Sequence, residues 1–372
     1  MSATSVAGII FANAYDETLE CLTKKRSIAS VLYGGRYRLI DFSLSNLVNA
    51  GVTNVGIITK EKYRSLMDHI GSGIYWDLDR KSGGVRILPP FNISRARLYQ
   101  NHIEALYGAM DFIIRCNAET MVLCDARTVA NVDIESILNK HTANKADVTV
   151  VCYKGLERVN TDNTMTLSTD KNNRVLLAGF PDKIAADDYR SMGIYVFNRD
   201  KLIELVKNSY ENGGNTIGEN IISANVDNLK VMTYEHKGYV AVMDSIKAYR
   251  KSNFDLLRSD IRKDLFNADR PIYTKTRDDM PTRYGTKSAV SNSLIAEGCI
   301  IEGTVKNSVL FRGVKVVKGA VVENSILMQS VTVGADAVVD NAVFDKNASI
   351  GDGMVARGTE DKAFFVEKNQ QI

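Results

Sequence analysis

The sequence predicts two domains, a Rossmann-like α/β domain with a mostly parallel sheet and flanking helices, followed by a parallel β-helix. In the first part of the chain, short apolar segments alternate with segments of helical periodicity, a rhythm typical of a parallel sheet covered by helices. In the last part, short apolar steps recur at a fixed spacing, which is typical of a β-helix. A chain of 372 residues is long enough for two such domains.

The elements of the first domain follow one another in a regular order. Runs of apolar residues predict three buried strands, at 6–11, 54–59 and 121–124. A short helix over 43–50 ends at Gly51. A second helix carries five apolar residues on one face: Ile103, Leu106, Met110, Ile113 and Ile114. Nucleotide or phosphate sites in such sheets lie beyond the carboxyl ends of the strands.

The middle of the chain is richer in strands. We expect strands at 147–153 and 191–197, a hairpin through 171–173, and a helix that begins near Ile246. From 267 to 289 the sequence is polar and irregular, with Pro271 and Pro281. We interpret that segment as a linker, which gives an α/β domain over 1–266 and a β-helix over 290–372.

The final segment contains an internal repeat. Asn307-Ser-Val-Leu310, Asn324-Ser-Ile-Leu327 and Asn341-Ala-Val-Phe344 recur at intervals of 17 residues. Apolar steps separated by Gly, Asn and Asp corners indicate coils that bury Val and Ile inward and stack on their neighbours. A few surface hairpins would not explain the fixed period.

Composition excludes several classes of protein. The formal charge of +3 is spread along the chain, and its densest cluster, at 24–26, is too short to indicate nucleic-acid binding. The five cysteines are scattered and suggest neither zinc nor a disulfide framework. No apolar run approaches the ~20 residues of a membrane span. We expect a cytoplasmic protein that contacts neither nucleic acid nor membrane.

One long motif carries a family resemblance. Tyr33-Gly-Gly-Arg-Tyr-Arg-Leu-Ile-Asp-Phe-Ser-Leu-Ser-Asn46 closely resembles a segment of the ADP-glucose pyrophosphorylases, or glucose-1-phosphate adenylyltransferases. Segments at 69–79, 191–197 and 248–253 resemble other parts of that family. The resemblance implies a nucleotidyltransferase domain and a left-handed β-helix of hexapeptide repeats. It also implies a tetramer and a reaction that joins ATP and glucose 1-phosphate with magnesium, releasing diphosphate.

The family's phosphate loop is degenerate in this chain. Alignment on residues 11–19 places Asn13, Ala14 and Asp16 where the family has glycines, and Thr18 where it has an arginine. Glycines there let backbone N–H groups approach phosphates closely. Acidic side chains in their place repel a triphosphate. Ile28 stands where the family carries a lysine.

The sugar-phosphate side is altered as well. Gly179 and Phe180 replace a Glu-Lys pair, so a second phosphate-binding cation is missing. Tyr99, Asp125 and Ser191 match family residues that touch substrate or metal. Each of the three also has a simpler interpretation, as a packed residue or the end of a strand.

The metal carboxylates are a mixed case. Asp125 matches the family's first magnesium ligand, whereas Val242 occupies the position of the second. Asp244 lies two residues further on, about 6.5 Å along the same strand face. Asp125 and Asp244 are therefore the only candidate metal pair, and the shift works against the strict octahedral geometry that magnesium requires.

These losses suggest a chain that acts through a partner. We expect a non-catalytic or weakly catalytic regulatory subunit of a heterotetrameric ADP-glucose pyrophosphorylase in glycogen biosynthesis, paired with a catalytic subunit or forming a homo-oligomer when alone. No cofactor is expected for the chain alone, and Mg²⁺ only if activity remains. The alternative is an active adenylyltransferase with a remodelled site. A phosphorylated effector is a further expected partner, with four candidate cations: Lys24, Lys25, Arg26 and Arg312.

Overall fold

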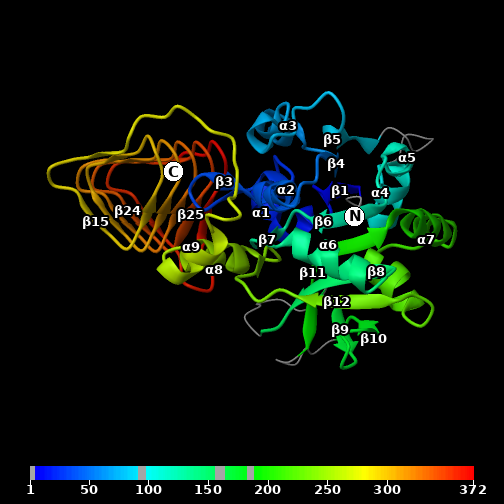
Figure 1. Ribbon diagram of the computed structural model, residues 1–372. Helices are drawn as coiled ribbons and strands as arrows, with labels where there is room; N and C mark the ends of the chain where they lie inside the picture. Colours follow the sequence, from blue (N-terminus) through cyan, green and yellow to red (C-terminus); the bar gives the residue numbers. More distant parts are fainter. Residues whose placement is uncertain (1–4, 91–97, 156–163, 182–187) are drawn as a thin grey trace.

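The computed structural model describes residues 5–90, 98–155, 164–181 and 188–372 (Figure 1). Figure 1 shows the chain passing from an N-terminal α/β domain into a β-helix, whose coils lie against one end of that domain. The five cysteines are all free, as their scattered positions predict. In the part of the chain that the structure describes, no helix is both long and apolar enough to cross a membrane.

The α/β domain is built on a nine-stranded sheet. Its strands are β1 (Val6–Phe11), β4 (Asn54–Ile58), β5 (Gly84–Leu88), β6 (Thr120–Asp125), β8 (Val148–Tyr153), β9 (Thr166–Thr169), β10 (Val175–Gly179), β11 (Tyr189–Asn198) and β12 (Val231–Glu235). The order is β10–β9–β11–β6–β1–β4–β5, and β8 pairs with both β11 and β12. The expected strands and the hairpin are therefore present.

The sheet is mixed rather than mostly parallel. β1 runs parallel to β4 and to β6, and β4 runs parallel to β5. β11 reverses the pattern, because it pairs antiparallel with β6, β8 and β9. Apolar runs show that strands are buried, but they do not fix the direction of a neighbour. The expectation therefore holds for one half of the sheet only.

Helices cover both faces of this sheet. Side chains of β1 alternate between two cores, with Ile9 in one and Ile10 in the other. The first core takes residues from α4 (His102–Gly108), α5 (Met110–Arg115) and α7 (Arg199–Glu211). The second takes residues from α2 (Leu39–Asn49), α3 (Arg64–Ile70) and α6 (Ile134–Ala143). Two layers of helices thus enclose the sheet.

Two helices differ from the expected bounds. α2 begins at Leu39, earlier than expected, because the Asp41 carboxylate accepts a hydrogen bond from the Arg38 N–H at 3.0 Å and caps the first turn. The single helix expected over 103–114 is divided at Ala109, the shared cap of α4 and α5.

The C-terminal domain is a parallel β-helix. Its short strands form three five-stranded parallel sheets. One of them stacks Val305, Val322 and Val339 in register. The corners of the coils are asparagines with φ of +47° at Asn307 and +48° at Asn324 and Asn341. Asparagine tolerates this left-handed conformation better than most residues do. The predicted repeat is thereby confirmed.

The first coil begins before residue 290. β14 (Arg283–Tyr284) pairs with β17 (Ile300–Ile301), and β15 spans Ala289–Ser291. Part of the segment interpreted as a linker therefore belongs to the β-helix. The single apolar step of this first coil is too short to stand out from the polar sequence around it.

The two domains share one hydrophobic core. Phe311, Met328 and Val343 of the β-helix pack with Phe42 and Tyr249 of the α/β domain in a single cluster. Figure 1 shows α8 (Ile246–Asp255) and α9 (Ser259–Leu265) beside the coils. Continuous apolar burial of this kind fixes the orientation of two domains.

Candidate functional site

A cavity of about 260 Å³ lies at the carboxyl ends of β1 and β6. This is where an α/β sheet places its ligands. Six side chains dominate its chemistry: Tyr15, Glu17, His102, Asp125, Arg127 and Phe180. Of the residues that the sequence singled out, Ala14, Asp125, Phe180 and Ser191 line it.

The side chains of the loop after β1 bind backbone groups of other segments of the domain. Asn13 Oδ1 accepts a hydrogen bond from the Lys60 N–H at 2.9 Å, and Asn13 Nδ2 donates to the Glu61 carbonyl at 3.0 Å. The Thr18 hydroxyl lies 3.1 Å from the Met243 carbonyl. Asn13, at a glycine position of the resembled family, and Thr18, at its arginine position, thus anchor the loop to other segments.

Asp16 is turned away from the cavity. Its carboxylate accepts hydrogen bonds from the Ile28 N–H at 2.7 Å and from Asn13 Nδ2 at 2.8 Å. Burial raises its pKa to about 6, against the opposing effect of these hydrogen bonds. Ile28 is itself a core residue, 1% exposed. Of the two acidic residues in this loop, Glu17 lines the cavity and Asp16 does not.

Two residues that sequence reasoning missed, Tyr15 and Arg127, form the centre of the site. The guanidinium carbon of Arg127 lies 3.4 Å from the centre of the Tyr15 ring, a close cation–π contact. The His102 ring lies 5.3 Å from the same ring. Burial first, and then the neighbouring Asp125 carboxylate, raise the pKa of the Tyr15 hydroxyl well above its usual range.

Asp125 ends β6 within this group. Its Oδ1 lies 3.6 Å from His102 Nε2. A Cβ at Gly193, where φ is +69°, would come within 2.2 Å of Asp125 Oδ2. Only glycine fits there. Ser191 is occupied locally, since its hydroxyl lies 3.2 Å from the Tyr195 hydroxyl and accepts the Gly193 N–H at 3.2 Å.

The expected sugar-phosphate side presents an aromatic surface in place of a cation. Phe180 follows β10 and is 42% exposed at the edge of the cavity. Gly179 ends β10 and does not line the cavity. Tyr99 is buried in the core, with Lys60 Nζ 5.8 Å from its ring. Its simpler interpretation as a packed residue agrees with this position.

The donor set does not fit magnesium. Asp125 is the one carboxylate of the expected pair that lines the cavity, and its Oδ1 lies 3.6 Å from His102 Nε2. Asp244 lies outside the cavity, and its Oδ1 accepts a hydrogen bond from the Ser245 hydroxyl at 3.2 Å. Among the residues described, no group of three or more His, Cys, Asp or Glu side chains could hold a metal ion. Octahedral coordination by hard oxygen ligands is not offered here.

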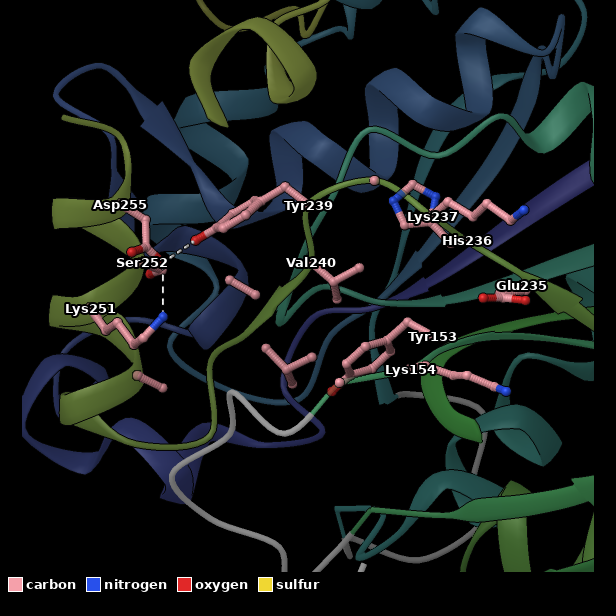
Figure 2. A pocket seen from close by; sticks show the side chains of 15 residues that line it. Tyr153, Lys154, Glu235, His236, Lys237, Tyr239, Val240, Lys251, Ser252 and Asp255 are labelled. Carbon is pink, nitrogen blue, oxygen red and sulfur yellow. Dashed lines mark hydrogen bonds and ion pairs between the residues drawn. The ribbon is translucent and has the colours of Figure 1, made fainter. Parts of the chain in front are cut away.

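Val242, at the position of the missing metal ligand, lines a different cavity. This second cavity, of about 520 Å³, lies between the ends of β8 and β12 and helix α8 (Figure 2). The Tyr239 hydroxyl donates to Asp255 at 3.0 Å, and Lys251 Nζ lies 3.3 Å from the same carboxylate. Figure 2 shows Lys154 and Glu235 on the other side. Charges of both signs face this space, so it carries no marked preference for phosphate.

The four candidate effector cations differ in their burial and in their partners. Arg26 is buried and pairs with Asp345 of the β-helix, with Nη2 2.8 and 2.9 Å from the two carboxylate oxygens. Lys24 pairs with Glu367 at 2.5 Å on the surface, and Lys25 is exposed. Arg312 lies 3.3 Å from Glu297.

A different set of cations gathers between the domains. We call Arg38, Arg277, Lys346 and Lys368 the cationic cluster. Burial and the neighbouring cations lower the pKa of Lys346. Burial lowers the pKa of Arg38 to about 10, with Arg26 and Arg277 adding to the effect. Like charges that depress one another's pKa indicate a region of positive potential. Its members lie far apart in the chain, and Lys25 and Arg26, which were singled out from the sequence, act on Lys368.

Comparison with known proteins agrees with this architecture. Residues 7–247 match the nucleotidyl transferase family, and residues 279–370 match the GlmU-like C-terminal hexapeptide family. The hexapeptide match is typical of the left-handed β-helix that three parallel sheets form. The two matched segments coincide with the two domains seen in Figure 1.

Relatives match along most of the chain. The glycogen biosynthesis protein GlgD of Geobacillus stearothermophilus is 39% identical over 319 residues, 85% of this chain and 82% of that protein. GlgD of Bacillus subtilis (strain 168) is 33% identical over 86% of this chain and 83% of its own length. The glucose-1-phosphate adenylyltransferase of Clostridium botulinum (strain Eklund 17B / Type B) is 35% identical over 87% of this chain and 84% of its own. The chain therefore belongs to the nucleotidyl transferase family, in the branch that contains GlgD proteins and glucose-1-phosphate adenylyltransferases.

Proposed function

We propose that this chain is a regulatory subunit that modulates a catalytic glucose-1-phosphate adenylyltransferase in glycogen biosynthesis. The observation that carries the proposal is the loop after β1. Its side chains are bound to backbone groups of neighbouring segments, and the Tyr15 ring lies against Arg127 at the carboxyl ends of β1 and β6. Similarity to the GlgD proteins supports the glycogen-related role.

Catalysis in such a site would need positive charge on the phosphates and a metal held by carboxylates. Among the described residues that line this cavity, Arg127 is the one Lys or Arg side chain, and it is already engaged with Tyr15. Glu17 and Asp125 add two negative charges to the lining. A triphosphate brought here would meet repulsion that the loop amides cannot offset, and magnesium would be relevant only to residual activity.

An assay of the chain alone and in mixture tests this proposal. The purified chain and the glucose-1-phosphate adenylyltransferase of Geobacillus stearothermophilus, itself a relative at 32% identity, are assayed separately and together for ADP-glucose formation. We expect no turnover by this chain alone, and a higher rate or a lower KM in the mixture. If mixing changes neither quantity, the regulatory role is wrong.

The alternative is an active adenylyltransferase with a remodelled site. It is favoured by one observation, the position of Asp125 at the end of β6 inside the cavity. Turnover of ATP and glucose 1-phosphate by the pure chain, abolished by Asp125→Ala, would establish it.

Sedimentation of the chain alone and with the catalytic partner measures whether it forms a homo-oligomer or a heterotetramer.

The cationic cluster is the proposed site for a phosphorylated effector. An anion bound there would relieve the mutual repulsion that lowers the pKa values of Arg38 and Lys346. Arg26 is excluded from this role, because Asp345 already neutralises it. Lys346→Met should weaken the effector response of the mixture, whereas Lys247→Met, in an exposed pair with Asp361, should leave it unchanged. Equal responses in the two variants would contradict this assignment.

A further inference from the structure

Tyr15 lies where the carboxyl ends of β1 and β6 meet. It belongs to the loop that follows Phe11 and precedes a short turn of 3-10 helix at Asp16–Leu19. Its ring is held against Arg127, with the guanidinium carbon 3.4 Å from the ring centre. The His102 ring is the second aromatic neighbour, at 5.3 Å. His102 is in turn fixed by an edge-on contact with Phe11 at 5.0 Å.

The residues on either side of Tyr15 are anchored. Asn13 is tied to the segment after β4 by two hydrogen bonds, to the Lys60 N–H and the Glu61 carbonyl. Asp16 accepts the Ile28 N–H at 2.7 Å. With both flanks held, the ring has little freedom to leave the cavity by a local movement of the loop.

The space that remains is small for a nucleotide. With Tyr15 in place the cavity measures about 260 Å³, below the roughly 300–1,000 Å³ of typical small-molecule pockets. A base or ribose seated beside Arg127 would have to displace the ring, since an aromatic face already occupies the guanidinium.

We propose that Tyr15 is the residue that closes this cavity to nucleotides, by occupying with its own ring the place where a nucleoside would contact Arg127 and His102. This inference deepens the proposed function and rests on it, since it explains how a fold of this family can be kept from binding a nucleotide. It assigns specificity to one side chain rather than to the lost glycines alone.

The test is a gain of binding in the full-length chain. Adenosine is the probe, because it brings an aromatic base to the cavity without bringing phosphates to Glu17 and Asp125. Binding is measured by calorimetry for the wild type, Tyr15→Ala and the matched control Tyr15→Phe. We expect Tyr15→Ala to bind adenosine about tenfold more tightly than the wild type, or better. Tyr15→Phe should behave as the wild type, since it keeps the ring and its contact with Arg127.

MgATP, measured beside adenosine, should gain less affinity from Tyr15→Ala, because its phosphates meet the acidic lining. The inference is overturned if Tyr15→Ala is folded and binds adenosine no better than the wild type, or if Tyr15→Phe gains as much. Thermal unfolding reports whether the variant is folded. If it is not, Tyr15→Leu replaces it, which keeps an apolar side chain in the loop but removes the aromatic ring from Arg127. A several-fold gain of adenosine affinity is then expected, and no gain overturns the inference.

The outcome is separable from that of the proposed function. Absence of any effect when the wild-type chain is mixed with a catalytic partner would remove the regulatory role, whatever adenosine does. Failure of Tyr15→Ala to gain binding would remove the role of Tyr15 and leave a positive mixing experiment untouched.

Discussion

Arg26 and Asp345 form a buried, two-oxygen ion pair that joins the α/β domain to the β-helix. The guanidinium Nη2 lies 2.8 and 2.9 Å from the two carboxylate oxygens. The Arg26 side chain is 5% exposed and the Asp345 side chain 4%. Arg26 lies two residues before Ile28, whose N–H donates a hydrogen bond to the Asp16 carboxylate in the loop after β1. One interdomain contact and one loop contact are therefore carried by the same short segment.

Breaking that pair should be costly. Arg26→Ala leaves Asp345 buried without its partner, and we expect a loss of about 3–5 kcal/mol in the free energy of unfolding, measured by urea unfolding. Lys24→Ala, two residues away in an exposed pair, is the matched control and should give no measurable change. Equal effects of the two variants would contradict this account. The double variant Arg26→Met/Asp345→Leu should recover much of the loss, because it leaves no buried charge.

The pH dependence of stability should carry a signature of Asp16. Its pKa is about 6 in the fold against an ordinary value of 3.8, so the folded chain binds the proton more tightly than the unfolded chain does. Its contribution to stability therefore falls as the pH rises from about 4 to about 6, and is constant above that. The measurement is the difference in unfolding free energy between the wild type and Asp16→Asn, taken at several pH values. If the difference in unfolding free energy does not change between pH 4 and pH 6, the pKa of Asp16 is not raised by the fold.

Gly193→Ala should displace Asp125. A positive φ costs a non-glycine residue about 1–2 kcal/mol, and here a Cβ would in addition come within 2.2 Å of Asp125 Oδ2. Gly51→Ala is the matched control, since its φ is +74° but nothing lies within 4 Å of the added Cβ. We expect a clearly larger drop in Tm for Gly193→Ala. The same drop in both variants would mean that glycine is required at position 193 by its positive φ alone, and not by the closeness of the Asp125 carboxylate.

The β-helix core should respond to truncation as a packed interior does. Leu327 is 0% exposed, so Leu327→Ala should lower the free energy of unfolding by about 2–5 kcal/mol. Leu177→Ala removes the same atoms from a residue that is 64% exposed, and should change it by no more than about 0.5 kcal/mol. Urea unfolding of both variants checks this, and a small effect at Leu327 would show that the coils are loosely packed.

Much of the fold could be predicted because its signals are local or periodic. The repeat that places Asn307, Asn324 and Asn341 at equivalent corners is visible in the sequence, and the structure gives all three the same left-handed backbone. The direction of β11 could not be predicted, since pairing with β6 and β8 is set by long-range packing. An apolar strand buried on both faces reads the same in either direction.

The site was predicted less completely for a related reason. Comparison with the family located the altered loop, because Asn13 and Asp16 stand at positions where glycine is expected. It did not reveal Tyr15 and Arg127, since their contact joins two loops that are distant in sequence. The only signal was that each follows the end of a predicted buried strand. Likewise, Lys24, Lys25 and Arg26 look alike in the sequence, and only the fold buries the third.

The Arg26 ion pair gives the loop after β1 a second support outside its own domain. Asp16 and Ile28 are twelve residues apart, and Arg26, in the chain between them, makes a buried ion pair with Asp345 of the β-helix. The segment that holds Asp16 is therefore bound to both domains, and a change in the β-helix around Asp345 would act on the loop after β1 through Arg26 and Ile28.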